Sequence, residues 1–155
     1  MQLDNRSQLD DRPLSLVNVS NARQLGRLVE DLRDVAARGY NGETDADYAV
    51  LVNAVAGTVR DEEATLDKVF RLFPRVREIR AVDPGPLGGV ARCGRGRDDQ
   101  YYVTMCAWAD QISVGTVTFL SFKERLGPPG NDFVEIRSEL EFPIPGADPR
   151  PVITR

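Results

Sequence analysis

The only two cysteines of this chain, Cys93 and Cys106, lie within GGVARCGRGRDDQYYVTMCAWAD, residues 88–110. The twelve residues between them exclude a redox motif of the C-x-x-C type. The sequence has no histidine and no third cysteine, so it lacks the usual ligands of a zinc site and the base of a cysteine nucleophile. Two interpretations remain open: a structural disulfide, or two reduced thiols that pack as small hydrophobic side chains.

Hairpin geometry favours the disulfide over the free thiols. Residues 90–96 and 100–110 predict two strands joined by a polar turn at 98–100, whose position is set without reference to the cysteines. This turn places Cys93 and Cys106 opposite each other on one sheet face, where Cβ atoms are about 4.5–5.5 Å apart. A bridge there would close about 14 residues, stabilise the fold by roughly 3 kcal/mol and indicate an oxidising, extracytoplasmic compartment.

The first half of the chain predicts alternating helix and strand. Apolar residues recur with helical spacing after the possible N-caps Ser20 and Asn21, up to Gly39. A continuous apolar run then indicates a buried strand. The expected elements are an extended lead-in over 1–19 with a short edge strand at 14–19, a helix over 21–38, a strand over 47–59, and a helix between Asp61 and Pro74.

In the second half the period of the pattern changes to two, which predicts an antiparallel meander followed by a short helix. The expected strands are 76–82, 90–96, 100–110 and 112–121, and the expected helix is 132–140. This order predicts an α+β fold, a two-layer sandwich in which two to three helices cover one face of a mostly antiparallel sheet of about four to five strands. We expect one domain over 20–141, between the lead-in at 1–19 and a proline-rich tail at 142–155.

The charge distribution points to one region of the chain. The net charge is −4, yet residues 68–97 carry eight basic and two acidic side chains, a net charge of +6. Nucleic-acid-binding proteins usually combine net positive charge with interleaved aromatic residues, so this composition argues against nucleic acid as the partner. The longest apolar run, around Tyr48–Thr58, is shorter than the roughly 20 residues of a membrane helix. Two interpretations of the basic block remain open: its arginines are each solvated or paired locally, or they face a partner, which we expect to be a protein or a cell-envelope component.

Four residues near the cysteines are expected to be structural. Trp108 lies two residues after Cys106 on the same predicted strand, so both side chains should lie on one sheet face. Trp108 should therefore pack beside the bridge. Asp110 is expected to satisfy backbone amides of a turn. Gly88 and Gly89 belong to the PGPLGG crossover, which lacks the lysine and the following helix of a phosphate-binding loop. Because the chain has no histidine and only two lysines, the sequence predicts a non-enzymatic protein without a metal or cofactor.

The run VDPGPLGGVARCG (82–94), the CAWAD motif (106–110) and the strand SVGTVTF (113–119) resemble an uncharacterised actinobacterial family of extracytoplasmic domains. The resemblance covers about residues 47–121. Members of that family follow a single transmembrane helix or a lipoprotein signal, so the resemblance implies a membrane anchor that is not in this sequence. The combination PGPLGG…C…CAWAD is specific to the family and implies no known chemistry.

Taken together, these patterns predict a disulfide-stabilised, non-enzymatic binding or sensory domain outside the cytoplasm, anchored to a membrane, with an unidentified protein or envelope component as its partner. The alternative is a small cytosolic regulatory or assembly protein with reduced cysteines. The candidate contact residues are arginines that alternate along two strands and are expected to gather on one solvent-facing side: Arg77, Arg80, Arg92, Arg95 and Arg97.

Overall fold

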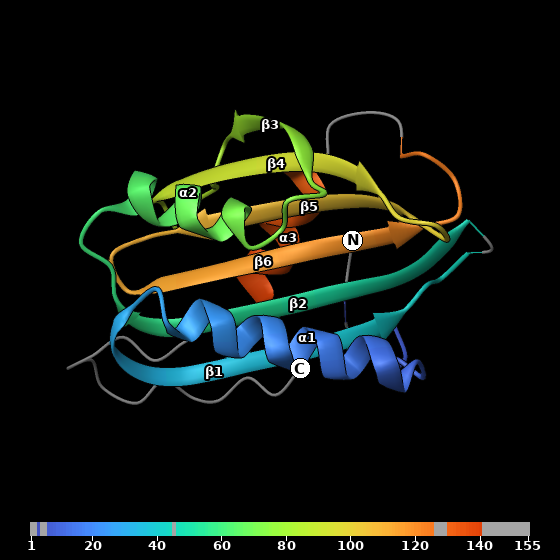
Figure 1. Ribbon diagram of the computed structural model, residues 1–155, viewed down its shortest axis with the longest axis horizontal. Helices are drawn as coiled ribbons and strands as arrows, with labels where there is room; N and C mark the ends of the chain where they lie inside the picture. The colour runs from blue at the N-terminus through green and yellow to red at the C-terminus, as the bar shows by residue number, and fades with distance from the viewer. Residues whose placement is uncertain (1–2, 4–5, 45, 126–129, 141–155) are drawn as a thin grey trace.

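One open antiparallel sheet of six strands forms the centre of the described chain, and three helices pack on it (Figure 1). The computed structural model describes residues 3, 6–44, 46–125 and 130–140. The strand order is β1-β2-β6-β5-β4-β3, and all neighbours are antiparallel. The elements are α1 (Arg12–Gly26), β1 (Glu30–Asn41), β2 (Asp47–Thr58), α2 (Glu62–Arg71), β3 (Arg77–Val82), β4 (Val90–Arg97), β5 (Tyr102–Ala109), β6 (Ser113–Ser121) and α3 (Gly130–Glu139).

The helices divide between the two faces of the sheet. Figure 1 shows α1 and α2 in front of the sheet and α3 behind it. On the front face, Leu25 of α1 and Leu66 of α2 pack in one apolar cluster with Met105 of β5. On the far face, Phe133 and Ile136 of α3 pack in a second cluster. The α+β class with an antiparallel sheet is confirmed, and α1 and α2 share one face, whereas the sheet has six strands rather than four to five and α3 covers the other face.

The additional strand, β1, replaces the second half of the helix expected over 21–38. Val35 lies opposite Val55, and Arg38 lies opposite Val52, in an antiparallel ladder with β2. The apolar spacing of this segment also fits a helix, which is why the sequence pattern misled. The buried strand β2 needs hydrogen-bond partners on both sides, and β1 supplies those on the side away from β6.

Helix α1 begins at Arg12, so the lead-in predicted over 1–19 is not extended throughout. The Asp11 carboxylate accepts a hydrogen bond from the Leu14 amide at 3.0 Å, and Pro13 lies in the first turn, where a missing amide costs nothing. The valines of LSLVNV favoured a strand in the sequence pattern. The N-cap and the complete burial of Leu25 on the sheet favour the helix instead.

The remaining expected elements are confirmed with small shifts of their ends. Asp61 caps α2 by accepting a hydrogen bond from the Ala64 amide at 3.0 Å. The segment 83–89 separates β3 from β4, and β3 to β6 form the expected meander. The helix expected at 132–140 is α3. The proline-rich tail at 142–155 lies outside the described residues.

Both edge strands contain an acidic residue with a left-handed backbone. Asp31 in β1 has φ 50°, Glu78 in β3 has φ 53°, and each lies at a shift in the pairing register. Within the described part of the chain, these are the only non-glycine residues with positive φ. Bulges of this kind bend an edge strand and place charge on it, which protects an open edge from pairing with another sheet.

Candidate binding surface

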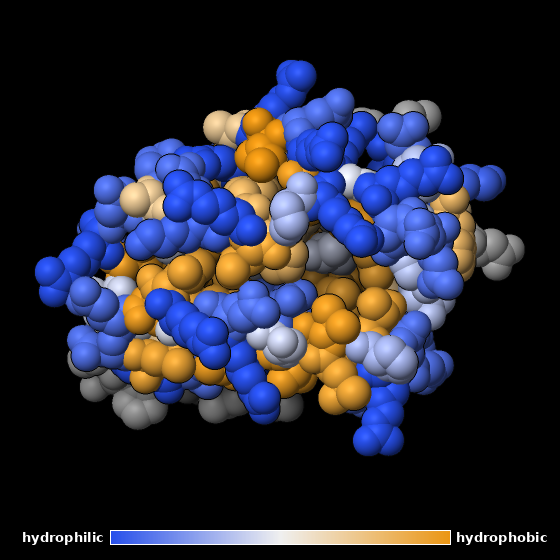
Figure 2. All heavy atoms as spheres, in the orientation of Figure 1, coloured by the Kyte–Doolittle hydropathy of each residue, from blue (hydrophilic) through white to orange (hydrophobic). Residues whose placement is uncertain are grey.

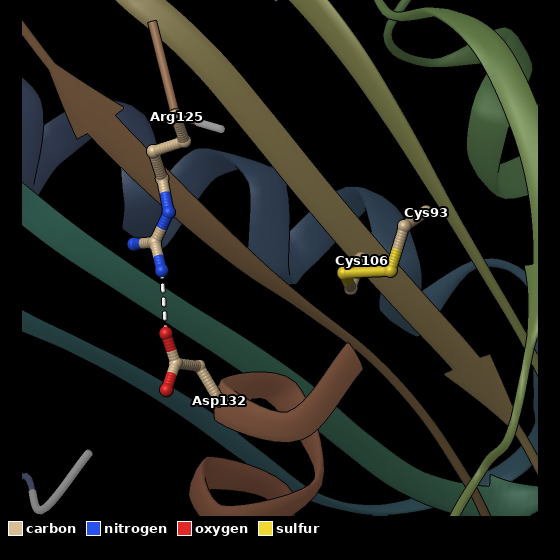
Figure 3. Close-up of a disulfide and its surroundings, with 4 residues drawn as sticks. All are labelled: Cys93, Cys106, Arg125 and Asp132. Carbon is tan, nitrogen blue, oxygen red and sulfur yellow. Dashed lines mark hydrogen bonds and ion pairs between the residues drawn. A yellow bond between two sulfur atoms is a disulfide. The ribbon is translucent and has the colours of Figure 1, made fainter. Parts of the chain in front are cut away.

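Cys93 of β4 and Cys106 of β5 form a disulfide, with their Cα atoms 4.0 Å apart (Figure 3). The two residues are direct cross-strand partners, as the hairpin register predicted. Cys93 is 6% exposed and Cys106 is 0% exposed, so the bridge lies within the core between the sheet and α3. The predicted disulfide is confirmed, and it uses both cysteines of the chain.

The indole of Trp108 packs in the same core as the disulfide. Its ring centroid lies 6.1 Å from that of Phe133 on α3. Its Nε1 donates a hydrogen bond to the Ser113 hydroxyl at 3.0 Å, which satisfies the one polar atom of the ring. Trp108 therefore connects the β5–β6 hairpin with α3.

A buried ion pair holds α3 on the same hairpin. The Arg137 guanidinium, whose side chain is 2% exposed, donates to the Asp110 carboxylate at 2.7 Å. It also donates to the carbonyl oxygens of Pro84 and Gly88, at 2.9 and 2.7 Å, and so binds the PGPLGG loop to α3. Burial lowers the pKa of Arg137, and the Asp110 charge opposes that shift. Arg137 is thus the centre of a network that joins three segments.

Asp110 also organises the turn before β6. Its Oδ1 accepts hydrogen bonds from the Ile112 amide at 2.9 Å and from the Ser113 hydroxyl at 3.0 Å. Beside it, Gly89 has φ 83°, and a Cβ on this residue would lie 2.4 Å from the Ala109 carbonyl oxygen. Gly88 has φ 76° as well. These contacts shape the scaffold of the hairpin and of the crossover loop.

A second ion pair lies at the start of α3. Figure 3 shows the Arg125 guanidinium, just beyond β6, directed at the Asp132 carboxylate in the first turn of α3. The same guanidinium lies over the Phe119 ring, 4.3 Å from its centroid. Because the Arg137 pair lies in the last turn, α3 is held to the sheet near both of its ends.

Four of the five candidate arginines share one face of the sheet. The register of β3 and β4 places Arg77 opposite Arg95 and Arg80 opposite Cys93, on the side that α3 covers. Arg97 follows Arg95 at a spacing of two, so it lies on the same side. We call these four residues the arginine edge: Arg77, Arg80, Arg95 and Arg97.

Arg92 lies on the opposite face of β4, so the expectation that all five arginines gather on one side is wrong. Its guanidinium donates to the carboxylates of Glu63 and Asp67 on α2, both at 2.6 Å. The bond from Arg92 lowers the pKa of Asp67, and the same bond raises the pKa of Arg92. Through these two ion pairs, Arg92 connects α2 to strand β4.

An open groove of about 590 Å³ lies between α2 and β3, next to this ion pair. It runs along the face of β3 and β4 that is opposite the arginine edge. Its lining combines apolar and charged side chains: Asp67, Phe70, Arg71, Ile79, Ala81 and Arg92.

No family model, curated protein or solved structure matches this chain. Its geometry is thus the basis for assigning a function. In the described segments, no group of three or more histidine, cysteine or acidic side chains is placed to hold a metal ion. Nor does any helix described here combine the length and the apolar character needed to cross a bilayer.

The structure also contains a buried polar cluster between α1 and the sheet that sequence reasoning missed. Asn53 Nδ2 donates to Asn18 Oδ1, and Thr116 Oγ1 donates to Asn53 Oδ1, both at 2.8 Å. Asn18 Nδ2 donates in turn to the carbonyl oxygens of Arg38 and Val52, at 3.1 Å each. The one available signal was an asparagine within the apolar run DYAVLVNAVAG.

Proposed function

We propose that this chain is a non-catalytic binding domain of an oxidising, extracytoplasmic compartment, and that its arginine edge binds an acidic surface of a partner protein. The observation that carries the proposal is the exposure of Arg77 and Arg80 on the edge strand β3, beside the hairpin that the disulfide closes. A cell-envelope polymer that carries anionic groups is the second class of ligand that the test must separate.

The disulfide supports the assignment of the compartment. Disulfides persist in extracytoplasmic, oxidising surroundings, whereas cytosolic reductants keep most protein thiols reduced. Cys93 and Cys106 are separated by 13 positions in the sequence, and a bridge over a loop of that length stabilises a fold by about 3 kcal/mol. The hairpin that it closes also carries Arg95 and Arg97, so the bridge rigidifies half of the arginine edge.

The chemistry of the arginine edge supports an acidic partner. A guanidinium donates two parallel hydrogen bonds to a carboxylate, a geometry that lysine cannot match. Five of the six β3 residues are exposed, and β3 has no strand on its outer side within the described residues. The Arg97 guanidinium lies over the ring of its cross-strand partner Tyr102, 4.7 Å from the ring centroid, a cation–π contact that restricts the side chain.

Two of the described carboxylates are tuned away from general acid–base catalysis. Asp11 and Asp67 both have a lowered pKa, because Tyr48 and Arg92 donate hydrogen bonds to them. A lowered pKa makes a carboxylate a weaker base and leaves it ionised, which is the opposite of the tuning that general acid–base catalysis needs. The chain has no histidine to take that role.

Charge reversal on the edge tests the binding proposal. The probe is a poly-glutamate peptide, with binding measured by calorimetry at low and at high salt. We expect Arg77→Glu/Arg80→Glu to weaken binding at least tenfold, and high salt to weaken it in the unchanged protein. Arg27→Glu/Arg33→Glu makes the same change in charge near the opposite edge and is expected to bind as the unchanged protein does. Equal affinity of both variants would exclude the arginine edge as the binding surface.

Two further measurements separate the partner classes and the compartments. Cross-linking to a membrane and envelope fraction, followed by mass spectrometry and polymer analysis, distinguishes an acidic protein from an anionic polymer. Thiol labelling of the protein isolated under non-reducing conditions tests the compartment. Two free thiols in the native protein would contradict the extracytoplasmic assignment and support the cytosolic alternative.

A further inference from the structure

The outer side of α1 exposes apolar side chains in the middle of the helix, where a surface helix normally carries polar residues. Leu16 is 60% exposed and Val17 is 51% exposed, whereas Asn18 is 2% exposed beneath the same helix. Pro13, Leu16, Val17 and Ser20 follow the i, i+3, i+4, i+7 spacing, so they form one stripe along the helix. This helix therefore buries an asparagine in the molecule and presents a leucine and a valine to solvent.

Further exposed apolar side chains lie on α1 and on the neighbouring edge strand β1. Val19 is 39% exposed, Leu32 is 49% exposed and Val35 is 43% exposed. With Leu16 and Val17, these residues are five of the eight exposed large hydrophobic side chains in the described chain. Over the part of the view where Figure 1 places α1 and β1, Figure 2 shows apolar atoms on both sides of a band of hydrophilic side chains. Several exposed apolar side chains on two neighbouring elements indicate an interaction surface.

We propose that this stripe is the interface of a symmetric dimer, in which α1 packs antiparallel against α1 of a second copy. The order of charges along the helix favours a second copy as the partner. Asp10, just before the N-cap Asp11, lies six residues before Leu16, and Arg23, in the last turn of the helix, lies six residues after Val17. A two-fold axis between Leu16 and Val17 places Leu16 opposite Val17 of the other copy, and Asp10 opposite Arg23.

The contact is between helices because the neighbouring edge strand resists sheet pairing. Asp31 interrupts β1 with its left-handed backbone. The Val35 amide, on the same strand, donates to the Asp34 carboxylate at 2.9 Å. Antiparallel packing of α1 also brings the opposite ends of two helix dipoles together, which is favourable. The interface therefore covers the exposed stripe and leaves the protected edge of β1 unpaired.

Sedimentation equilibrium of the full, oxidised chain tests this proposal. We expect a dimer in the unchanged protein, and a monomer with native far-ultraviolet circular dichroism in Leu16→Glu/Val17→Glu, with a dissociation constant at least tenfold higher. Leu87→Glu is the matched control, because Leu87 is 54% exposed in the crossover loop and lies outside the stripe. This control is expected to remain a dimer. A monomeric unchanged protein at about 1 mM would overturn the proposal, and so would a dimer that survives Leu16→Glu/Val17→Glu.

A charge-reversal pair tests the predicted register without changing the apolar stripe. Arg23→Glu places like charges opposite each other and is expected to weaken the dimer, and Asp10→Arg/Arg23→Glu is expected to restore it. Failure of the double variant to restore the dimer would overturn the antiparallel register. Vesicles of anionic and neutral lipid form a separate arm: a monomer that binds them through Leu16 and Val17 would show that the stripe is a membrane contact. Arg77→Glu/Arg80→Glu should leave the dimer intact, so this inference can fail independently of the proposed function.

Discussion

Trp108 of β5 and Gly115 of β6 are direct cross-strand partners, and the indole ring occupies the space over the glycine. A Cβ on Gly115 would lie 2.2 Å from Cη2 of that ring. The ring is fixed by the Ser113 hydroxyl, which accepts its hydrogen bond, and by Phe133 of α3. Only glycine at position 115 therefore allows the indole to pack beside the disulfide.

Gly115→Ala is expected to lower the free energy of unfolding by about 3 kcal/mol, because overpacking a filled core costs typically 1–3 kcal/mol or more. Urea unfolding followed by far-ultraviolet circular dichroism measures the loss in both backgrounds. Gly130→Ala is the matched control, since a Cβ there has no atom within 4 Å. In a Trp108→Leu background, Gly115→Ala should cost much less. An equal cost in both backgrounds would show that the clash with the indole is not the cause.

Local patterns predicted the hairpin and the caps, because their causes lie within a few residues. The pairing of Cys93 with Cys106 follows from the position of one turn, and the start of α2 follows from Asp61. Arg92 and Arg95 are three residues apart on β4, an odd spacing that places their side chains on opposite faces of the sheet. The prediction of a single arginine cluster did not take this spacing into account.

Features that depend on distant segments were not predictable in the same way. Strand β1 supplies hydrogen-bond partners to one side of β2, because β6 pairs only with the other side. This requirement depends on the pairing of β2 with β6, which is distant in the sequence. Arg137 is buried because Asp110 and the carbonyl oxygens of Pro84 and Gly88 converge on it from two other segments. In the sequence it is one arginine on a short amphipathic helix, a position where arginine is normally exposed to solvent.

Removing the Arg137 guanidinium is expected to destabilise the fold strongly. Arg137→Gln leaves the Asp110 carboxylate, whose side chain is 18% exposed, without its cation, and breaking such a pair costs about 3–5 kcal/mol. Arg137→Lys should recover only part of the loss, because one ammonium cannot reach all three acceptors. Urea unfolding measures the loss of stability. The near-ultraviolet circular dichroism of Trp108 reports on the packing of α3 against the sheet. Arg33→Gln, at an exposed position, is the control; a comparable loss there would rule out the buried pair as the cause.

The disulfide is expected to contribute about 3 kcal/mol to the free energy of unfolding. Cys93→Ala/Cys106→Ala should show that loss by urea unfolding, while its far-ultraviolet circular dichroism stays native. Because Cys93 is 6% exposed and Cys106 is 0% exposed, a thiol reductant should attack the bridge only when the hairpin opens. Reduction followed by mass spectrometry should therefore accelerate in mild urea. Fast reduction of the native protein would contradict the burial of the bridge.

Glu78→Gly is expected to stabilise the protein. Glu78 has φ 53°, a left-handed conformation that costs a non-glycine residue about 1 kcal/mol or more and that glycine adopts without strain. We expect the free energy of unfolding to rise by up to about 1 kcal/mol, since glycine also loses more entropy on folding. Glu78→Ala keeps the Cβ and the strain, so it should bring no gain. If both variants were equally stabilising, removal of the Glu78 charge would explain the effect instead.

The contact between Tyr48 and Asp11 makes stability depend on pH at both extremes. The Tyr48 hydroxyl donates to the Asp11 carboxylate at 2.6 Å, which lowers the pKa of Asp11 below its ordinary 3.8 and raises the pKa of Tyr48 above its ordinary 10.0. The contribution of Asp11 to stability is therefore complete above the ordinary value and is lost as the pH falls through the lowered one. The contribution of Tyr48 is complete below pH 10.0 and is lost as the pH rises through its raised pKa.

Tyr48→Phe removes the donor and leaves the second partner of Asp11, the Leu14 amide, in place. We expect the pKa of Asp11, measured by carboxyl-carbon NMR, to rise toward 3.8 in this variant. The loss of stability between about pH 7 and about pH 2 should become smaller, because Asp11 then binds its proton with similar affinity in both states. Tyr40→Phe should leave both quantities unchanged. An Asp11 pKa that stays low in Tyr48→Phe would assign the shift to the helix N-cap bond from Leu14 rather than to the tyrosine.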